Sequence, residues 1–166
     1  ERGINTVPTT SMGRLFDAAS ALAGVRQTAN YEAQAAIEFE ALVDSTEGCS
    51  YEFVLSDADT RIVVEPGPVL TGIVDDVRAG VPVGVIAARF HTAAATMIID
   101  VAERIRARTG ITTVGLSGGV FQNVTLTHAA ATALGERGFA VLIHRLVPPN
   151  DGGLALGQAV IAARRR

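Results

Sequence analysis

Tryptophan and lysine are absent from this sequence of 166 residues, and cysteine occurs only once, at Cys49. A single cysteine excludes an intrachain disulfide and a cysteine-rich zinc site. The neighbours Glu47, Gly48 and Ser50 include no basic group that would activate a thiolate, so Cys49 is not expected to be a nucleophile. The first residues lack the basic start and apolar segment of a signal peptide. We therefore expect a cytoplasmic piece of a longer chain.

Strong charge of one sign and long apolar runs are also missing. The formal net charge is −3, so apart from a short arginine tail at residues 164–166 there is no basic field for a nucleic-acid backbone. The longest apolar stretches, residues 81–88 and 93–99, fall short of the ~20 residues that span a membrane. Hydrophobic residues make up 48% of the chain, enough to bury one core. Residues 1–166 are predicted to form a single domain that binds neither nucleic acid nor membrane.

The order of the predicted elements indicates an α/β fold. Extended runs predict an antiparallel hairpin from residues 51–55 and 61–65, and a buried parallel pair of strands from residues 112–117 and 139–144. Because strand and helix alternate with short joints near the C-terminus, we expect helices to cover the parallel pair. Helical spacing predicts helices over residues 11–24, 31–43, 69–79, 82–108, 121–137 and 152–163.

The sharpest local motif is Leu116-Ser117-Gly118-Gly119-Val120-Phe121-Gln122-Asn123, where a buried strand turns into a helix. Two glycines without side chains let a ligand approach the backbone, and a helix start offers free N–H groups to a phosphate. Glycine is also common at such turns for geometry alone. The motif predicts an anion-binding turn, and Asn123 adds a polar side chain to it.

A second motif, Val147-Pro148-Pro149-Asn150-Asp151-Gly152-Gly153, follows the second strand of the parallel pair. Parallel strands end at the same edge of a sheet, which is where open α/β sheets bind their ligands. Asp151 either caps the last helix or offers one hard oxygen ligand to a divalent cation. One carboxylate is not a complete metal site.

The remaining polar candidates carry weaker signals. Asp17 lies between apolar residues on the first predicted helix, so it either faces solvent or points a carboxylate into a cleft. His91, His128 and His144 are scattered without the paired spacing that holds zinc, and they are expected to be ordinary packed or surface side chains.

Four segments stand out together: residues 11–19, residues 31–38, Leu116 to Asn123, and residues 147–159. In sequence and in order they resemble the C-terminal part of the HypF family, the carbamoyltransferases of [NiFe]-hydrogenase maturation. The two central segments resemble this family more than the related O-carbamoyltransferases or tRNA threonylcarbamoyl-transferases. The resemblance implies the second lobe of an actin/Hsp70-like (ASKHA) nucleotide-binding fold, a TsaD-like domain with a mixed sheet and flanking helices.

The resemblance also implies a reaction. In the family, carbamoyl phosphate and ATP yield carbamoyl adenylate, and the carbamoyl group passes to the C-terminal cysteine of a partner protein, HypE. Residue by residue, Asp17 is similar to an aspartate that binds the ribose, Gly118 and Gly119 to a glycine pair beside the nucleotide, and Asn123 to an asparagine that contacts it. Asp151 is similar to an aspartate that joins two histidines around a divalent metal, such as zinc, iron or magnesium.

The sequence departs from the family pattern in two places. The two histidines belong to an HxxxH motif that these 166 residues do not contain, so this chain alone is not expected to complete the metal site. The alternative is a non-catalytic role in packing or partner docking. Ala33 stands where the family often has glycine. If the backbone there needs a positive φ, alanine is unfavourable at this position.

Overall fold

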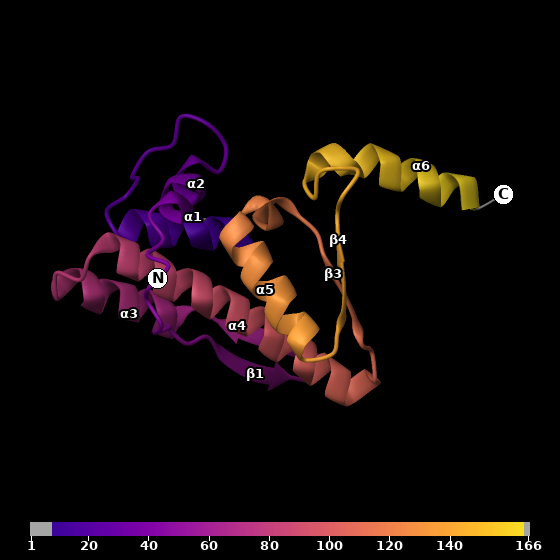
Figure 1. Ribbon diagram of the computed structural model, residues 1–166, viewed down its shortest axis with the longest axis horizontal. Helices are drawn as coiled ribbons and strands as arrows, with labels where there is room; N and C mark the ends of the chain where they lie inside the picture. Colours follow the sequence, from indigo (N-terminus) through magenta and orange to yellow (C-terminus); the bar gives the residue numbers. More distant parts are fainter. Residues whose placement is uncertain (1–7, 165–166) are drawn as a thin grey trace.

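The structure is a computed structural model that describes residues 8–164. Figure 1 shows the elements arranged around one long central helix, and the predicted order of helices and strands is confirmed. In chain order they are α1 (Met12–Leu22), α2 (Gln34–Ala41), β1 (Val54–Ala58), β2 (Arg61–Glu65), α3 (Gly67–Arg78), α4 (Val83–Thr109), β3 (Thr113–Leu116), the 3-10 helix η1 (Gly119–Gln122), α5 (Val124–Glu136), β4 (Ala140–Ile143), the 3-10 helix η2 (Asp151–Gly153) and α6 (Leu154–Arg164).

Two helices begin three residues later than predicted, each for a local reason. The helix predicted from residue 31 begins at Gln34, because Ala33 has φ 61° and ψ 10° and this left-handed backbone cannot continue a right-handed helix. The helix predicted from residue 121 begins at Val124, because the chain first forms η1 and Asn123 then caps α5 by accepting a hydrogen bond from the Leu126 N–H.

The core consists of two clusters of buried side chains that share α4. The first gathers aromatic and aliphatic residues of α1, α2, α3 and α4, and within it Phe16 meets Phe90 edge-on with the ring centroids 4.8 Å apart. The second lies between the C-terminal half of α4, β3, α5 and Phe139. By length and composition α4 would suffice to cross a membrane, but 56% of its most apolar window is buried inside the fold. Burial in the core therefore accounts for its apolar character.

The strands form two separate sheets, so the expectation of one mixed sheet is wrong for the described residues. β1 and β2 pair antiparallel, while β3 and β4 pair parallel with Leu116 opposite Ile143. The hairpin turn is tighter than predicted and leaves only Asp59 and Thr60 between the strands. The sheets remain apart because the hairpin adjoins the first cluster through Val64, whereas the parallel pair belongs to the second.

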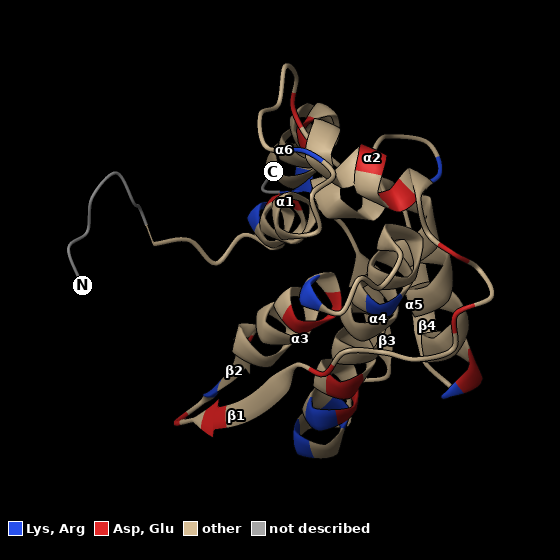
Figure 2. Cartoon of the chain, turned by 90° about the vertical axis from the view of Figure 1, so that its left-hand side faces the viewer, with Lys and Arg blue, Asp and Glu red and all other residues tan. Residues whose placement is uncertain are grey.

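Only part of the predicted helical cover over the parallel pair is present. Helix α5 packs against β4. Helix α6 does not cover the pair: it extends away from the rest of the fold at the end of β4 (Figure 1), and all of its described residues are exposed. The prediction that helices cover the parallel pair is therefore confirmed for α5 and wrong for α6. Acidic and basic residues are interspersed over the elements in Figure 2.

Candidate functional site

The two motifs predicted to share one edge of the parallel pair do meet there. The Gly118 N–H donates to the Pro149 carbonyl oxygen at 2.7 Å, which joins the turn after β3 to the loop after β4. His144 Nε2 lies 3.0 Å from Ser117 Oγ, a second link between the same two loops. The carboxyl ends of β3 and β4 thus form one continuous rim, as the topology of the parallel pair predicts.

The two glycines of the turn are present for different reasons. Gly118 has φ 105° and ψ 159°, a conformation that residues with a Cβ rarely adopt, so glycine is required there by the backbone. Gly119 has no such requirement, and a Cβ on it would meet Asn150 Cβ only at 4.0 Å. The side of the turn where these side chains would stand is open, so a ligand can approach the backbone closely there.

Asp151 begins η2 on this rim, and its side chain is exposed. The interpretation in which Asp151 acts as the cap is not what the structure shows, because Asn150 Oδ1 accepts the hydrogen bond from the Gly152 N–H at 3.0 Å. Gly153 is needed for packing, since a Cβ there would lie 2.8 Å from the Pro148 carbonyl oxygen. The Pro-Pro loop therefore packs closely against η2, while Asp151 stays exposed to solvent.

The described residues do not fit a complete metal site. Within residues 8–164, no three His, Cys, Asp or Glu side chains come together closely enough to hold an ion. Asp151 offers a single carboxylate, whereas divalent cations in proteins take several ligands. Asp151 is therefore at most one ligand of an ion whose other ligands lie outside this part of the chain.

Asp17 lies on α1, one of the elements that contacts η1. Val120 of η1 packs against the cluster that contains Phe16, so the helix carrying Asp17 and the glycine turn are neighbours. The Asp17 side chain is 27% exposed and pairs with Arg14 NH2 at 3.0 Å. Helix α1 therefore lies beside the glycine turn, but the structure shows no contact between the Asp17 side chain and that turn.

Both polar atoms of the Asn123 side-chain amide have hydrogen-bond partners. Oδ1 accepts from the Leu126 N–H at 2.7 Å, and Nδ2 lies 2.9 Å from His91 Nε2. One N–H and one lone pair remain for a ligand. Its part in nucleotide binding stays a prediction, while its role as the cap of α5 is a finding of the structure.

His91 is packed, as expected of the histidines, but its contact with Asn123 at this site was not predicted. It is 3% exposed and lies among the rings of Phe16, Phe39 and Phe90. Burial lowers its pKa below the ordinary 6.5, with an opposing effect from its bond to the Ala87 carbonyl. The available signal was its position beside Phe90 on the buried face of α4, where a polar side chain needs partners.

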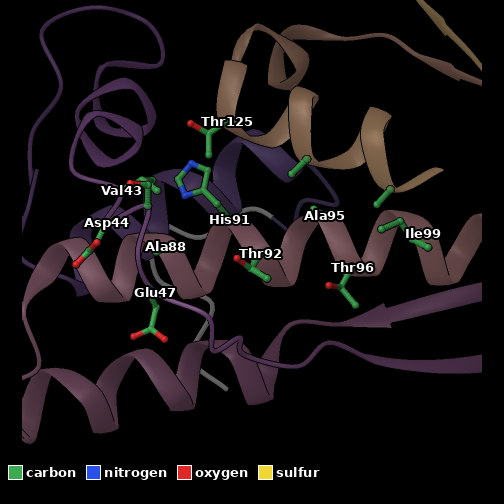
Figure 3. Close-up of a pocket in the computed structure, with 13 residues that line it drawn as sticks. Val43, Asp44, Glu47, Ala88, His91, Thr92, Ala95, Thr96, Ile99 and Thr125 are labelled. Carbon is green, nitrogen blue, oxygen red and sulfur yellow. The ribbon is translucent and has the colours of Figure 1, made fainter. Parts of the chain in front are cut away.

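A cavity of about 300 Å³ adjoins His91, between α4, α5 and the segment after α2. Figure 3 shows the imidazole between Val43 and Thr125 on this side of α4. None of the five residues predicted from sequence lines the cavity, although His91 connects it to Asn123. Its lining consists of Val43, Asp44, Ser45, Glu47, Ala88, His91, Thr92, Ala95, Thr96, Ile99, Thr125, Ala129 and Ala133.

One wall of the cavity is fixed by an ion-pair network. Arg89 NH2 lies 3.2 Å from Glu47 Oε2, and Arg89 NH1 lies 2.8 Å from Asp76 Oδ2. The Tyr51 hydroxyl donates to the same Asp76 oxygen at 2.6 Å, and burial followed by this hydrogen bond raises the pKa of Tyr51. These contacts tie the segment that carries Glu47 to α3 and α4, so we assign them a structural role.

Comparison with known families gives the class of protein. Residues 1–158 match the family model described as the second subdomain of a Kae1-like carbamoyltransferase domain. The chain therefore belongs to the HypF carbamoyltransferase family. It is 40% identical to the carbamoyltransferase HypF of Rhizobium leguminosarum bv. viciae over 95% of its length, and 36% identical to that of Synechocystis sp., also over 95%. In each case it spans 20% of the relative's length.

Solved structures agree with this assignment. A full-length HypF in its phosphate- and nucleotide-bound form is similar with a TM-score of 0.92 and 44% identity, over 98% of this chain and 21% of that one. The HypF of T. kodakarensis is similar with a TM-score of 0.75 and 26% identity, over 97% of this chain and 21% of that one. The resemblance inferred from four short motifs is thus confirmed over nearly the whole chain.

Proposed function

We propose that this chain is the second lobe of an actin/Hsp70-like nucleotide-binding fold and takes part in carbamoyl transfer. In this proposal ATP and carbamoyl phosphate yield carbamoyl adenylate, whose nucleotide lies on the rim formed after β3 and β4. The acceptor is the C-terminal cysteine thiol of HypE, on the route to the cyanide ligands of the hydrogenase iron. The reaction takes place in the cytoplasm.

The observation that carries the proposal is the 2.7 Å hydrogen bond from Gly118 to Pro149, because it brings the glycine turn and the loop of Asp151 to one rim. Independent motifs of the same family occupy both sides of this bond. The nucleotide-bound form of the full-length HypF relative supports a nucleotide as the ligand.

Each residue then has a defined task. The open side of the glycine turn lets phosphate oxygens approach backbone N–H groups other than that of Gly118, which donates to Pro149, and such groups stabilise negative charge without a side chain. Asn123 adds its free N–H, and Asp17 accepts a hydrogen bond from the ribose once its carboxylate turns from Arg14. Asp151 offers one carboxylate to a divalent ion, and no step of the transfer is assigned to that ion.

The transfer itself is an acyl substitution. The thiolate sulfur of the partner cysteine attacks the carbamoyl carbonyl carbon, and a carbon–sulfur bond forms. The bond between that carbon and the phosphate oxygen breaks, and AMP leaves with the electron pair. Cys49 lies between α2 and β1, outside both motifs of the rim, so the proposal assigns the nucleophile to the partner.

The test is Asp151→Ala in the full-length protein. Transfer of the carbamoyl group to HypE is expected to be lost, while formation of carbamoyl adenylate from ATP stays measurable. Asp75→Ala, an exposed aspartate on α3 with only a 4.0 Å contact to Arg78, is the matched control and should retain both activities. Equal loss of both steps in Asp151→Ala contradicts the assignment.

A second function, packing or docking without catalysis, is favoured by one observation. Helix α6 exposes four large apolar side chains, Leu154, Leu156, Val160 and Ile161, and such a surface is typical of an interface. Calorimetric titration of the 166 residues with ATP and Mg²⁺ separates the two functions. Binding supports a competent nucleotide subsite, and no heat supports a purely structural lobe.

A further inference from the structure

His91 and Asn123 form a chain of hydrogen bonds from the centre of α4 to the start of α5. His91 Nδ1 lies 2.7 Å from the Ala87 carbonyl oxygen, which can only accept, so Nδ1 carries the proton. In the neutral ring Nε2 is then an acceptor, and the Asn123 amide must present Nδ2 to it. Asn123 Oδ1 is thereby turned toward the Leu126 N–H, where it caps α5.

We infer that His91 is a positioning residue for the proposed nucleotide site: through Nε2 it fixes the side-chain amide of Asn123, and with it the first turn of α5 beside the glycine turn. The inference rests on the proposed function, since it gives Asn123 an orientation in which one N–H remains free for a nucleotide. His91 itself is 3% exposed, so it is assigned a positioning role and no direct contact with the nucleotide.

The geometry makes this arrangement depend on the state of the imidazole. If Nε2 gains a proton, two donors face each other, and the Asn123 amide must turn over or move away. Turning over presents Nδ2 to the Leu126 N–H and removes the cap. The charged groups around His91 are Glu40 on α2, which favours the protonated ring, and Asp44 and Glu47, which line the adjoining cavity. Glu40 Oε1 also accepts from the Thr125 N–H at 2.8 Å.

The experiment compares His91→Phe, which keeps an aromatic ring in the core, with His91→Gln, whose amide oxygen can still accept from Asn123. Phe90→Leu, next to it in the same core, controls for general loss of packing. The first measurement is amide hydrogen exchange of Leu126 relative to Ala130 in the interior of α5, followed by NMR on this chain. The second is ATP affinity of the full-length protein by calorimetry.

In His91→Phe we expect Leu126 to exchange about fivefold faster relative to Ala130, the effect of losing a helix cap, together with weaker ATP binding. His91→Gln should restore both, and Phe90→Leu should change neither ratio nor affinity. In the wild type, lowering the pH through the titration of His91 should produce the same loss of Leu126 protection. Asn123→Asp, which can accept from a protonated ring and still cap α5, should remove that pH effect.

Unchanged relative exchange of Leu126 in His91→Phe overturns the inference. A loss of Leu126 protection without a change in ATP affinity also overturns the inference, because the cap of α5 would then not affect nucleotide binding. A wild-type protein that binds no ATP refutes the proposed function instead, and the exchange ratio still decides whether His91 positions Asn123.

Discussion

Gly118 and Pro149 are joined by a backbone hydrogen bond of 2.7 Å, although they lie in separate loops after two different strands. The donor is Gly118, whose φ of 105° is a backbone conformation that residues with a side chain rarely adopt. The shape of the rim therefore depends on the backbone at a single position.

The two glycines should respond differently to alanine. Gly118→Ala is expected to cost about 1–3 kcal/mol in the free energy of unfolding, because it forces a Cβ into a strained backbone conformation. Gly119→Ala meets only Asn150 Cβ at 4.0 Å and should leave stability within about 0.5 kcal/mol. Urea unfolding of both variants measures the difference.

The two glycine variants also distinguish an effect on stability from an effect on ligand binding. If a nucleotide lies on the turn, Gly119→Ala in the full-length protein should weaken ATP binding while leaving the fold intact, because the new methyl group occupies the open side. Unaltered ATP affinity in a stable Gly119→Ala variant would show that no ligand approaches the backbone there.

Ala33 is the second strained position. It is exposed and has φ 61°, a left-handed conformation that costs a residue with a Cβ roughly 1–2 kcal/mol. Ala33→Gly should therefore raise the free energy of unfolding by about 1 kcal/mol, after subtraction of glycine's larger entropy in the unfolded chain. Ala18→Gly, at an exposed position inside α1, should lower it by about 1 kcal/mol. Thermal or urea unfolding that gives both changes the same sign contradicts this explanation.

Stability should depend on pH through His91. Burial lowers the pKa of His91 in the folded state, so the unfolded chain binds a proton that the folded chain resists. The contribution is fully present above the ordinary pKa of 6.5 and declines as the pH falls below it, by at most about 1.4 kcal/mol per pH unit. Urea midpoints between pH 7.5 and 5.5 measure the decline.

The control for this effect is His128→Gln, at an exposed position on α5, which should keep the wild-type slope. His91→Gln should flatten it. Glu38 affects stability only at lower pH. Hydrogen bonds from Arg26 and then Gln34 lower its pKa below the ordinary 4.5, so its contribution to the free energy of unfolding is lost only as the pH falls below that value. A slope between pH 6.5 and 5.5 that survives His91→Gln would assign the dependence to another group.

The apolar face of α6 should contribute little to folding. Leu156 and Ile161 are 52% and 58% exposed, so replacing both by glutamine should change the free energy of unfolding by less than about 0.5 kcal/mol. The double variant should also associate less in sedimentation velocity experiments. Leu134→Ala, in the buried second cluster, should cost about 2–5 kcal/mol. A large loss of stability in the α6 variant would mean that this helix packs against the fold.

Much of this molecule could be predicted from local patterns. Apolar spacing located the helices, turn residues located the hairpin, and the parallel pair required that Gly118 and Asp151 follow strands ending at one edge. The strain at Ala33 was anticipated from a departure from glycine, and φ 61° confirms it.

What could not be predicted depends on contacts between distant residues. The pairing of His91 with Asn123 joins a position on α4 to the residue that caps α5, and neither residue carries a local signal for the other. The exposure of α6 was not predicted. An apolar helix sequence does not indicate whether the helix packs against its own chain or against another surface. The separation of the two sheets was not predicted for a similar reason, since it depends on which hydrophobic cluster each strand pair packs against.

Ile98 contacts both hydrophobic clusters, in the middle of the helix that supplies buried side chains to each. Neither half of the molecule can therefore lose its packing without disturbing a helix on which the other half depends. The amphipathic N-terminal helices and the C-terminal strand pair should consequently unfold in a single transition. A substitution that disrupts packing at one end of this protein should therefore destabilise the other end as well.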